Sequence, residues 1–226
     1  MLVAIGDVHG QVWKLRDLLQ QIHELPLAED DRIVFVGDYV DRGPEVALTL
    51  DLLIQLRDQR PNTIFLRGNH DQSMMDVRDL LDPGRETELR FDDVSWWFQY
   101  GGRQTMASYG GENDWYRQVP PTHWQFLETT GMEHRESGYI FVHAGLLPKG
   151  MRWFDAADPR LWIREAFLES DDDFGGTVVF GHTPTRDGEP LVQPNKIGID
   201  TGAAYGGPLT AALLEPDHIV RFLRAD

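Results

Sequence analysis

The sequence predicts an α/β fold, and three observations carry this prediction. Strand-like and helix-like segments alternate through residues 1–70, as they do in a βαβαβ unit with a parallel sheet. The last third of the chain is rich in short β-forming runs. With 226 residues, 41% of them hydrophobic, the chain can build one sizeable core, which excludes a disordered or fibrous protein.

The first 70 residues contain three apolar runs that predict strands, at 2–5, 33–36 and 63–66. A helix is predicted after the first strand, where apolar residues recur at helical spacing: Val12, Leu15, Leu18, Leu19 and Ile22. A second helix is predicted after Pro44, which suits a first helical turn, and its apolar face holds Val46, Leu50, Leu53 and Ile54. The carboxyl ends of parallel strands meet at one edge of a sheet, so we expect a site there.

Residues 72–137 have a different character. We predict a mainly helical segment at about 72–108, a loop, and a short helix that begins near Thr122. Four tryptophans lie in this region, and we expect them to form its core: Trp96, Trp97, Trp115 and Trp124. The chain is therefore predicted to be a single domain over residues 1–226, with a mainly helical insertion at about 72–137.

The rest of the chain is predicted to form five strands and one helix. The strands are expected at 139–142, 177–180, 196–199, 209–214 and 219–223, and the helix near 159–170. Two of these strands also end in histidine turns, at His143 and at His182. The acidic run at 171–173 lacks the glycine and the closing glutamate of a calcium loop, so we interpret it as a solvated loop.

Composition and charge exclude several classes of function. The chain has no cysteine, which rules out disulfides, zinc–thiolate sites and thiol nucleophiles. It has 21 basic and 37 acidic residues, a net charge of −16, and no cluster of Lys and Arg, so we expect no nucleic-acid partner. No apolar run approaches the roughly 20 residues that span a bilayer, and the first residues do not resemble a secretory signal. We therefore expect no membrane partner and a cytoplasmic location.

Polar side chains follow five of the predicted strands. They carry oxygen and imidazole donors without sulfur, a set that suits Mn, Fe or Zn: Asp7, His9, Asp38, Asp41, Asn69, His70, His143 and His182. Any one of them could simply form a turn or cap a helix. Five such turns, each at the end of an apolar strand, favour a site.

These donors are sufficient in number for two metal ions. Asp7 and His9 can share one ion, and the two oxygens of Asp38 can bridge two ions. Asn69, His143 and His182 can complete the second ion. Two ions about 3.5–4 Å apart can clamp a phosphoryl group and share a hydroxide, so the pattern predicts phosphoryl transfer.

Five motifs resemble those of the phosphoprotein phosphatase family of metallophosphoesterases. They are G-D-V-H-G at 6–10, G-D-Y-V-D-R-G at 37–43, R-G-N-H-D at 67–71, F-V-H-A-G at 141–145 and F-G-H-T-P at 180–184. The compact form is most similar to the bacterial and phage branch, which includes lambda phosphatase and the symmetrical diadenosine tetraphosphatases. The resemblance implies a sandwich of two β-sheets flanked by helices, and a two-metal centre.

The resemblance also implies roles for individual residues. Asp7, His9 and the bridging Asp38 would bind the first metal, and Asp38, Asn69, His143 and His182 the second. His70 would be the general acid, with Asp41 as its carboxylate partner. Arg42 would hold phosphate oxygens, and Arg164, in a Trp-Ile-Arg stretch, would form a second phosphate clamp beside Asn69. Arg67 would either contact phosphate or form a structural ion pair, and Tyr205 is a candidate neighbour of the metals.

Together these features predict a metal-dependent phosphomonoester hydrolase that acts through a two-metal-activated hydroxide. We expect a phosphorylated protein substrate, with serine or threonine ahead of tyrosine, or a small phosphoester. A pyrophosphohydrolase of dinucleoside polyphosphates is the alternative. Asp71 matches the motif of the diadenosine tetraphosphatases, whereas those enzymes typically lack an aspartate at the position of Asp41. A catalytically silent metal-binding module is a weaker alternative, because the implied ligands and acid are all present. We expect two divalent ions, Mn²⁺ first, with Fe or Zn as alternatives, and leave the oligomeric state open.

Overall fold

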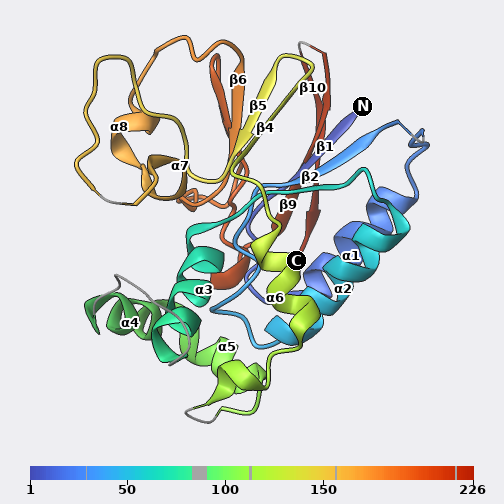
Figure 1. Cartoon of the computed structure of the whole chain (residues 1–226). Helices are drawn as coiled ribbons and strands as arrows, with labels where there is room; N and C mark the ends of the chain where they lie inside the picture. Colours follow the sequence, from blue (N-terminus) through green and yellow to red (C-terminus); the bar gives the residue numbers. More distant parts are fainter. Residues whose placement is uncertain (29, 83–90, 112–113, 156, 217) are drawn as a thin grey trace.

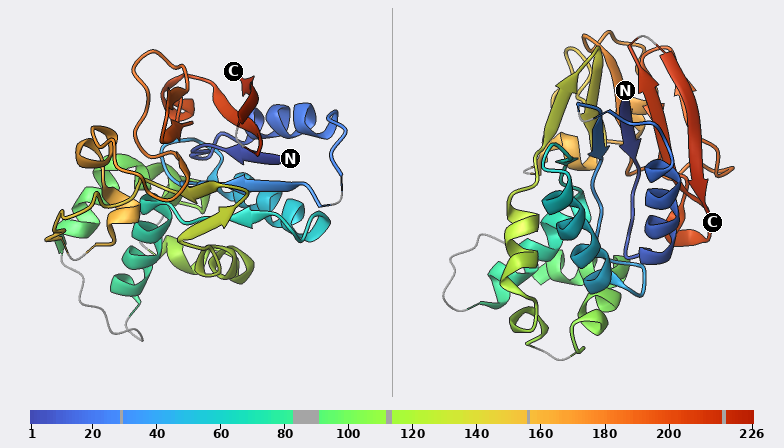
Figure 2. Two further views of the ribbon diagram at one scale, coloured as in Figure 1. Left: turned by 90° about the horizontal axis from the view of Figure 1, so that it is seen from above. Right: turned by 90° about the vertical axis from the view of Figure 1, so that its right-hand side faces the viewer.

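The protein folds as two stacked mixed β-sheets flanked by helices, as the resemblance of its motifs to those of the phosphatases implies. The computed structural model describes residues 1–28, 30–82, 91–111, 114–155, 157–216 and 218–226. The strand order is β10-β9-β1-β2-β3 in the first sheet and β4-β5-β6-β8-β7 in the second. In the right-hand view of Figure 2 the strands fill the upper half of the molecule, and the green helices lie below them.

The first sheet contains the predicted βαβαβ unit. Strands β1 (Leu2–Ile5), β2 (Arg32–Phe35) and β3 (Ile64–Phe65) are parallel. Helices α1 (Val12–His23) and α2 (Val46–Gln59) connect them and lie side by side against the sheet (Figure 1). Strands β9 (Leu209–Glu215) and β10 (His218–Ala225) complete the sheet in antiparallel orientation.

The second sheet has three parallel strands between two antiparallel edge strands. The parallel strands are β5 (Tyr139–Val142), β6 (Thr177–Phe180) and β8 (Lys196–Gly198), all of which were predicted. The edge strands β4 (Glu133–Glu136) and β7 (Leu191–Gln193) were not predicted. Strand β4 consists of four polar residues, so it has no apolar alternation and owes its conformation to pairing with β5.

Alternation along the strands divides the apolar residues between two faces of each sheet. Leu2 and Ala4 of β1 point between the sheets, where they pack in a cluster with Phe141 of β5. Val3 and Ile5 point to the other face and pack in a cluster with apolar residues of α1 and α2. A third cluster covers the outer face of the second sheet with Ile163, which follows α7 (Pro159–Trp162), and with residues of α8 (Glu165–Leu168). The core therefore holds both sheets and their helices in fixed relation.

The segment predicted as a helical insertion is mainly helical where it is described. It contains α3 (Asn69–Leu81), α4 (Phe91–Trp97), a π-helical turn (Phe98–Gly102), α5 (Arg103–Ser108), a 3₁₀ turn (Trp115–Arg117) and α6 (Pro121–Glu128). Residues 83–90 of the prediction lie outside the described residues. Two differences stand out: α3 begins at Asn69, before residue 72, and the segment ends in strand β4.

The tryptophan prediction is confirmed for three of the four residues. Trp97 and Trp115 are fully buried and stack with their ring centroids 5.1 Å apart. Trp124 is partly buried, packs against the core cluster and has its ring centroid 6.2 Å from that of Trp115. Trp96 is only half-buried and lies 5.3 Å from the His70 ring, so it lines the site instead. Among the residues described, no helix is both long and apolar enough to cross a membrane.

The single helix predicted near 159–170 is instead two short helices. Helix α7 ends at Trp162, and Ile163 takes an extended conformation with ψ 141°. Arg164 then has φ −131° and ψ −103° before α8 starts. This break turns the chain back toward the carboxyl ends of the strands, where Arg164 donates a hydrogen bond to the carbonyl of His182.

Candidate active site

The loops that follow the strands of both sheets meet at one place. Asp7, Asp38 and Asn69 follow β1, β2 and β3, while His143 and His182 follow β5 and β6. All eight polar residues predicted from the strand ends are buried, and none exposes more than 3% of its surface. The structure therefore brings the predicted residues together in one buried cluster.

The turns that carry these residues are conformationally strained. Six described non-glycine residues have positive φ, and five of them belong to this cluster: His9 (45°), Asp38 (55°), Asp41 (69°), Arg42 (65°) and His182 (65°). Left-handed backbone is unfavourable for side chains with a Cβ, and such residues concentrate where function requires a special geometry. The strain supports this cluster as the candidate active site.

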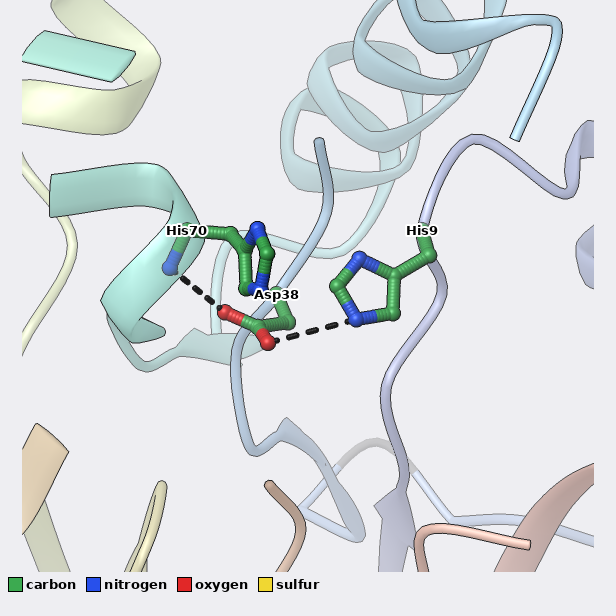
Figure 3. A group of neighbouring side chains, drawn as sticks. All are labelled: His9, Asp38 and His70. Carbon is green, nitrogen blue, oxygen red and sulfur yellow. Dashed lines mark hydrogen bonds and ion pairs between the residues drawn. The ribbon is translucent and has the colours of Figure 1, made fainter. Parts of the chain in front are cut away.

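Asp38 lies at the centre of the cluster (Figure 3). One carboxylate oxygen, Oδ1, accepts the main-chain N–H of His70 at 3.0 Å and lies 3.5 Å from His143 Nε2. The other, Oδ2, lies 3.3 Å from His9 Nε2. Each oxygen thus faces an imidazole from a different sheet, as a bridging carboxylate would.

Main-chain contacts at Nδ1 of His9 and His143 indicate that Nε2 is the nitrogen that can bind a metal. His9 Nδ1 contacts the carbonyl of Val40 at 2.7 Å, and His143 Nδ1 contacts that of Val36 at 3.0 Å. A carbonyl can only accept, so both Nδ1 atoms carry the proton, and in a neutral ring Nε2 then has a lone pair. Burial also lowers the pKa of His143 to about 4, so its ring is neutral near pH 7. A lone pair that faces the Asp38 carboxylate calls for a cation between them.

Asn69 and His182 extend the cluster on the side of His143. Asn69 Oδ1 lies 3.0 Å from His143 Nε2 and 2.9 Å from His182 Nδ1. Nε2 of His182 is buried and has no hydrogen-bond partner among the described residues. Asp38, His143 and His182 form one of two groups whose donor atoms lie within 4.8 Å of one another. The donor set fits a second metal ion.

Asp7 supplies a further unpaired acceptor. Its Oδ2 accepts the main-chain N–H of His182 at 3.0 Å, whereas its buried Oδ1 has no hydrogen-bond partner within the described part of the chain. Burial, together with the charges of Asp200 and Asp38, raises the pKa of Asp7 well above its ordinary value. Three carboxylates buried together are unstable as anions, and divalent cations would neutralise them.

His70 forms a buried pair with Asp41. His70 Nδ1 donates to Asp41 Oδ2 at 2.7 Å, and both side chains are at most 1% exposed. His70 also belongs to the second candidate group, with His9 and Asp38. Its Nδ1 is already occupied by Asp41, so only Nε2 remains for a ligand or a substrate. The pair has the geometry of a histidine that a carboxylate orients.

Asp71 supports the turn that carries Asp38. Its two carboxylate oxygens accept the main-chain N–H groups of Asp38 and Tyr39, both at 2.9 Å, and that of Gly68 at 2.8 Å. Burial raises the pKa of Asp71 to about 7. The residue therefore fixes the loop after β2 against the first turn of α3.

The arginines predicted from the motifs fall into two groups. Arg42 contacts His9 Nε2, and its guanidinium lies 5.4 Å from the centroid of the Tyr205 ring. Arg164 donates to the His182 carbonyl at 3.0 Å and to Thr183 Oγ1 at 3.1 Å. Both lie at the cluster. The structure also brings Tyr205 to this place, with 66% of its surface exposed.

Arg67 has a different environment. Its guanidinium donates to Gln72 Oε1 at 2.8 Å, to Thr130 Oγ1 at 3.1 Å and to the carbonyl of Glu128 at 3.1 Å. These bonds tie the end of α6 to the start of α3. Arg67 is thus structural, although its partners are hydrogen-bond acceptors rather than the predicted ion pair.

Two residues of the cluster were missed by the sequence analysis. Asp200 follows β8, is 5% exposed, and raises the pKa of Asp7. Its position after a strand could have identified it. Thr105 is fully buried on α5 and bonds to Asp41. A threonine inside a helical segment carries no signal of this kind, so only the structure reveals the contact.

Known proteins resemble this chain along most of its length. It is 28% identical to "Serine/threonine-protein phosphatase 1" of Salmonella typhimurium, over 94% of this chain and 91% of that protein. It is 29% identical to the symmetrical "Bis(5'-nucleosyl)-tetraphosphatase" of Janthinobacterium sp., over 92% and 90%. The crystal structure of a metallophosphoesterase from Sphaerobacter thermophilus shares the fold, with a TM-score of 0.57 and 20% identity over 100% of this chain and 87% of that one. The family model for calcineurin-like phosphoesterases matches residues 1–221, and the chain therefore belongs to the calcineurin-like phosphoesterase family.

Proposed function

We propose that this protein is a metal-dependent phosphomonoesterase that removes phosphate from serine or threonine side chains of proteins, with phosphotyrosine as a further substrate. The observation that carries the proposal is the buried pair of His70 and Asp41, joined at 2.7 Å beside Asp38. A serine alkoxide is a poor leaving group and needs a proton, which Nε2 of His70 can donate from the protonated ring that the Asp41 carboxylate stabilises. A nucleotide leaving group is a much weaker base and gains less from an acid.

The residues that would hold the metals follow from the contacts described above. Asp7 and His9 would bind one ion, Asn69, His143 and His182 the other, and Asp38 would bridge them. The unpaired Oδ1 of Asp7 and Nε2 of His182 support this assignment, because both are buried acceptors without a donor. Two divalent ions, manganese in our proposal, would neutralise phosphate charge and acidify a water molecule. Iron and zinc suit the same donor set.

Arg42 and Arg164 would bind the phosphate oxygens. Each guanidinium has donors directed toward the cluster, and an arginine fork binds phosphate through charge-assisted hydrogen bonds. Arg42 contacts His9 and Arg164 contacts the His182 carbonyl, so the two guanidinium groups approach the cluster at different histidines. This arrangement offers positive charge to an anionic substrate in a chain of net charge −16.

A second candidate function is the hydrolysis of dinucleoside polyphosphates. Aromatic side chains at the edge of the cluster favour it. Trp96 and Tyr100 stack with ring centroids 4.9 Å apart, and Trp162 meets Trp96 edge-on at 4.9 Å. Tyr100 is 45% exposed, so part of its side chain is accessible to a nucleobase. The tetraphosphatase relative is in line with this candidate.

A direct comparison of substrates tests the proposal. The purified protein is stripped of metal with a chelator, verified by elemental analysis, and reloaded with Mn²⁺. We expect no turnover without metal and restored turnover with it. A phosphoserine peptide should be hydrolysed with a higher kcat/KM than diadenosine tetraphosphate at the same metal concentration.

Three results would contradict the proposal in different ways. Full turnover by verified metal-free protein would refute the metal-dependent mechanism. Faster hydrolysis of diadenosine tetraphosphate would replace the first candidate by the second. A His182→Ala variant that keeps two ions per chain would show that His182 is not a ligand.

A further inference from the structure

The loop that carries Asp41 and Arg42 is held by the helical segment 98–108, which comprises the π-helical turn and α5. Both residues have left-handed backbone, with φ of 69° and 65°, and neither is a glycine. Such a conformation does not persist without partners that stabilise it. The partners come from a part of the chain about 60 residues away.

Thr105 binds Asp41 twice. Its hydroxyl accepts the main-chain N–H of Asp41 at 3.0 Å and donates to the carboxylate oxygen Oδ1 at 2.5 Å. The other carboxylate oxygen, Oδ2, is the one that binds His70 Nδ1. All three side chains are at most 1% exposed, so no water competes for these bonds. A continuous chain of hydrogen bonds therefore runs from Thr105 through Asp41 to His70.

Gly101 holds the next residue of the loop. Its carbonyl accepts the main-chain N–H of Arg42 at 3.2 Å. A Cβ at position 101 would lie 2.6 Å from that nitrogen, and Gly101 has φ 123°, so only glycine allows this approach. Gly102 in turn lies against the buried indole of Trp97, which stacks on Trp115. The packing of Gly102 on Trp97, and of Trp97 on Trp115, thus fixes the place where segment 98–108 contacts the loop.

From these contacts we propose that Thr105 is a positioning residue for the proton donor, which acts by fixing the Asp41 carboxylate that orients His70. The inference rests on the proposed function, because it assumes that His70 protonates the leaving group. The inference gives the helical segment 98–108 a role in catalysis.

The chemistry of the hydroxyl supports this role. A buried carboxylate with only one hydrogen bond can rotate about its Cβ–Cγ bond and leave the histidine unoriented. The bond from Thr105 to Oδ1 removes this freedom and leaves Oδ2 directed at Nδ1 of His70. Burial raises the pKa of Asp41 to about 7, and the Thr105 bond opposes this shift, which favours the carboxylate form that His70 requires.

Thr105→Val removes the hydroxyl and keeps the shape of the side chain. We expect kcat/KM for a phosphoserine peptide to fall about 10- to 100-fold, the effect of one hydrogen bond to a charged group. The loss for p-nitrophenyl phosphate should be only a few-fold, because its phenolate leaves without a proton. Metal content, measured by elemental analysis, should match that of the wild type. Thr105→Ser keeps the hydroxyl and should restore most of the activity on the peptide.

Thr49→Val is the matched control. Thr49 is fully buried on α2, and its hydroxyl has no partner among the described residues, so the same substitution there should leave both activities unchanged. Equal losses on both substrates for Thr105→Val, or no loss on either, would overturn the inference. If Thr105→Val does not fold, Thr105→Cys, whose thiol is a weak donor, should show the same dependence on the substrate. An inactive wild type would instead refute the proposed function.

Discussion

Gly68 approaches Asp38 so closely that no side chain fits between them. A Cβ on Gly68 would lie 2.0 Å from Asp38 Oδ1 and 2.2 Å from the Asp38 nitrogen. The backbone of Gly68 is extended, with φ −95° and ψ 167°, so an alanine would be tolerated by its conformation. The glycine is therefore required by the space that the proposed bridging carboxylate occupies.

Gly68→Ala should consequently displace Asp38. We expect a loss of about 1–3 kcal/mol in the free energy of unfolding, typical of overpacking, and less than two metal ions per chain. Gly131→Ala is the control, because a Cβ there would lie 3.5 Å from the Leu66 side chain and 3.9 Å from the Phe65 carbonyl oxygen, which are ordinary contacts. Thermal denaturation and elemental analysis of both variants check the prediction. Equal metal content in Gly68→Ala and wild type would show that metal binding does not require a glycine at position 68.

The second prediction concerns His70 as the general acid. His70→Asn should retain both metals but lose about 10²–10⁴-fold in kcat/KM on a phosphoserine peptide, which is the usual contribution of an acid. On p-nitrophenyl phosphate the loss should be smaller. Asp41→Asn should show the same pattern in milder form, since it removes only the carboxylate that orients the ring.

Steady-state kinetics on the two substrates distinguish this role from a structural one. If both variants lost activity equally on both substrates while their metals stayed bound, His70 would not be the acid. If His70→Asn instead lost a metal ion, the residue would be a ligand, as its place in the group with His9 and Asp38 allows.

The sequence predicts those parts of the structure that depend on local patterns. Strands β1, β2 and β5 are continuous apolar runs, and each ends in a glycine or histidine turn that can be read without knowledge of the fold. The residues of the candidate cluster follow such strands, so their convergence was predictable from the topology of parallel sheets.

Contacts between distant segments were not predictable in this way. The partner of Thr105 lies 64 residues earlier in the chain, and its helix gives no reason to expect a buried hydroxyl bond. Strand β4 is polar throughout, and its pairing with β5 alone makes it a strand. The break at Ile163 and Arg164 escaped prediction because the sequence around it has good helix formers on both sides.

The third prediction compares two arginines with different surroundings. Arg164→Ala should lower kcat/KM about 10- to 100-fold, because charge-assisted bonds to phosphate are worth roughly 1.5–3 kcal/mol, and should leave the metals in place. Arg67→Ala should lower the melting temperature and leave kcat/KM close to that of the wild type, since its donors bind Gln72, Thr130 and the end of α6. Wild-type kinetics in Arg164→Ala would remove it from the site, and a strong catalytic defect in a stable Arg67→Ala would place that residue there.

The last prediction concerns pH and metal binding. Burial raises the pKa of Asp41 and Asp71 to about 7, and that of Asp7 well above its ordinary value. In the folded, metal-free protein these carboxyls keep protons that the unfolded chain releases near pH 4, so their contribution to stability falls as the pH rises toward and past 7. Burial lowers the pKa of His70, His143 and His182, and these residues act in the opposite direction below about pH 6.5. The stability of metal-free protein should therefore fall between about pH 6.5 and pH 8.

Metal ions should reverse this trend, because they replace the protons on the carboxylates. The increase in melting temperature on addition of Mn²⁺ should be larger at about pH 8 than at about pH 5.5. His143 and His182 do not cause the difference, since burial lowers the pKa of His143 to about 4 and that of His182 well below its ordinary value. Asp7→Asn removes one of the raised carboxyls and should flatten the pH dependence of metal-free stability. Thermal denaturation with and without Mn²⁺ tests this prediction: metal-free stability that rises between about pH 6.5 and pH 8 would mean that these carboxylates are already compensated without metal.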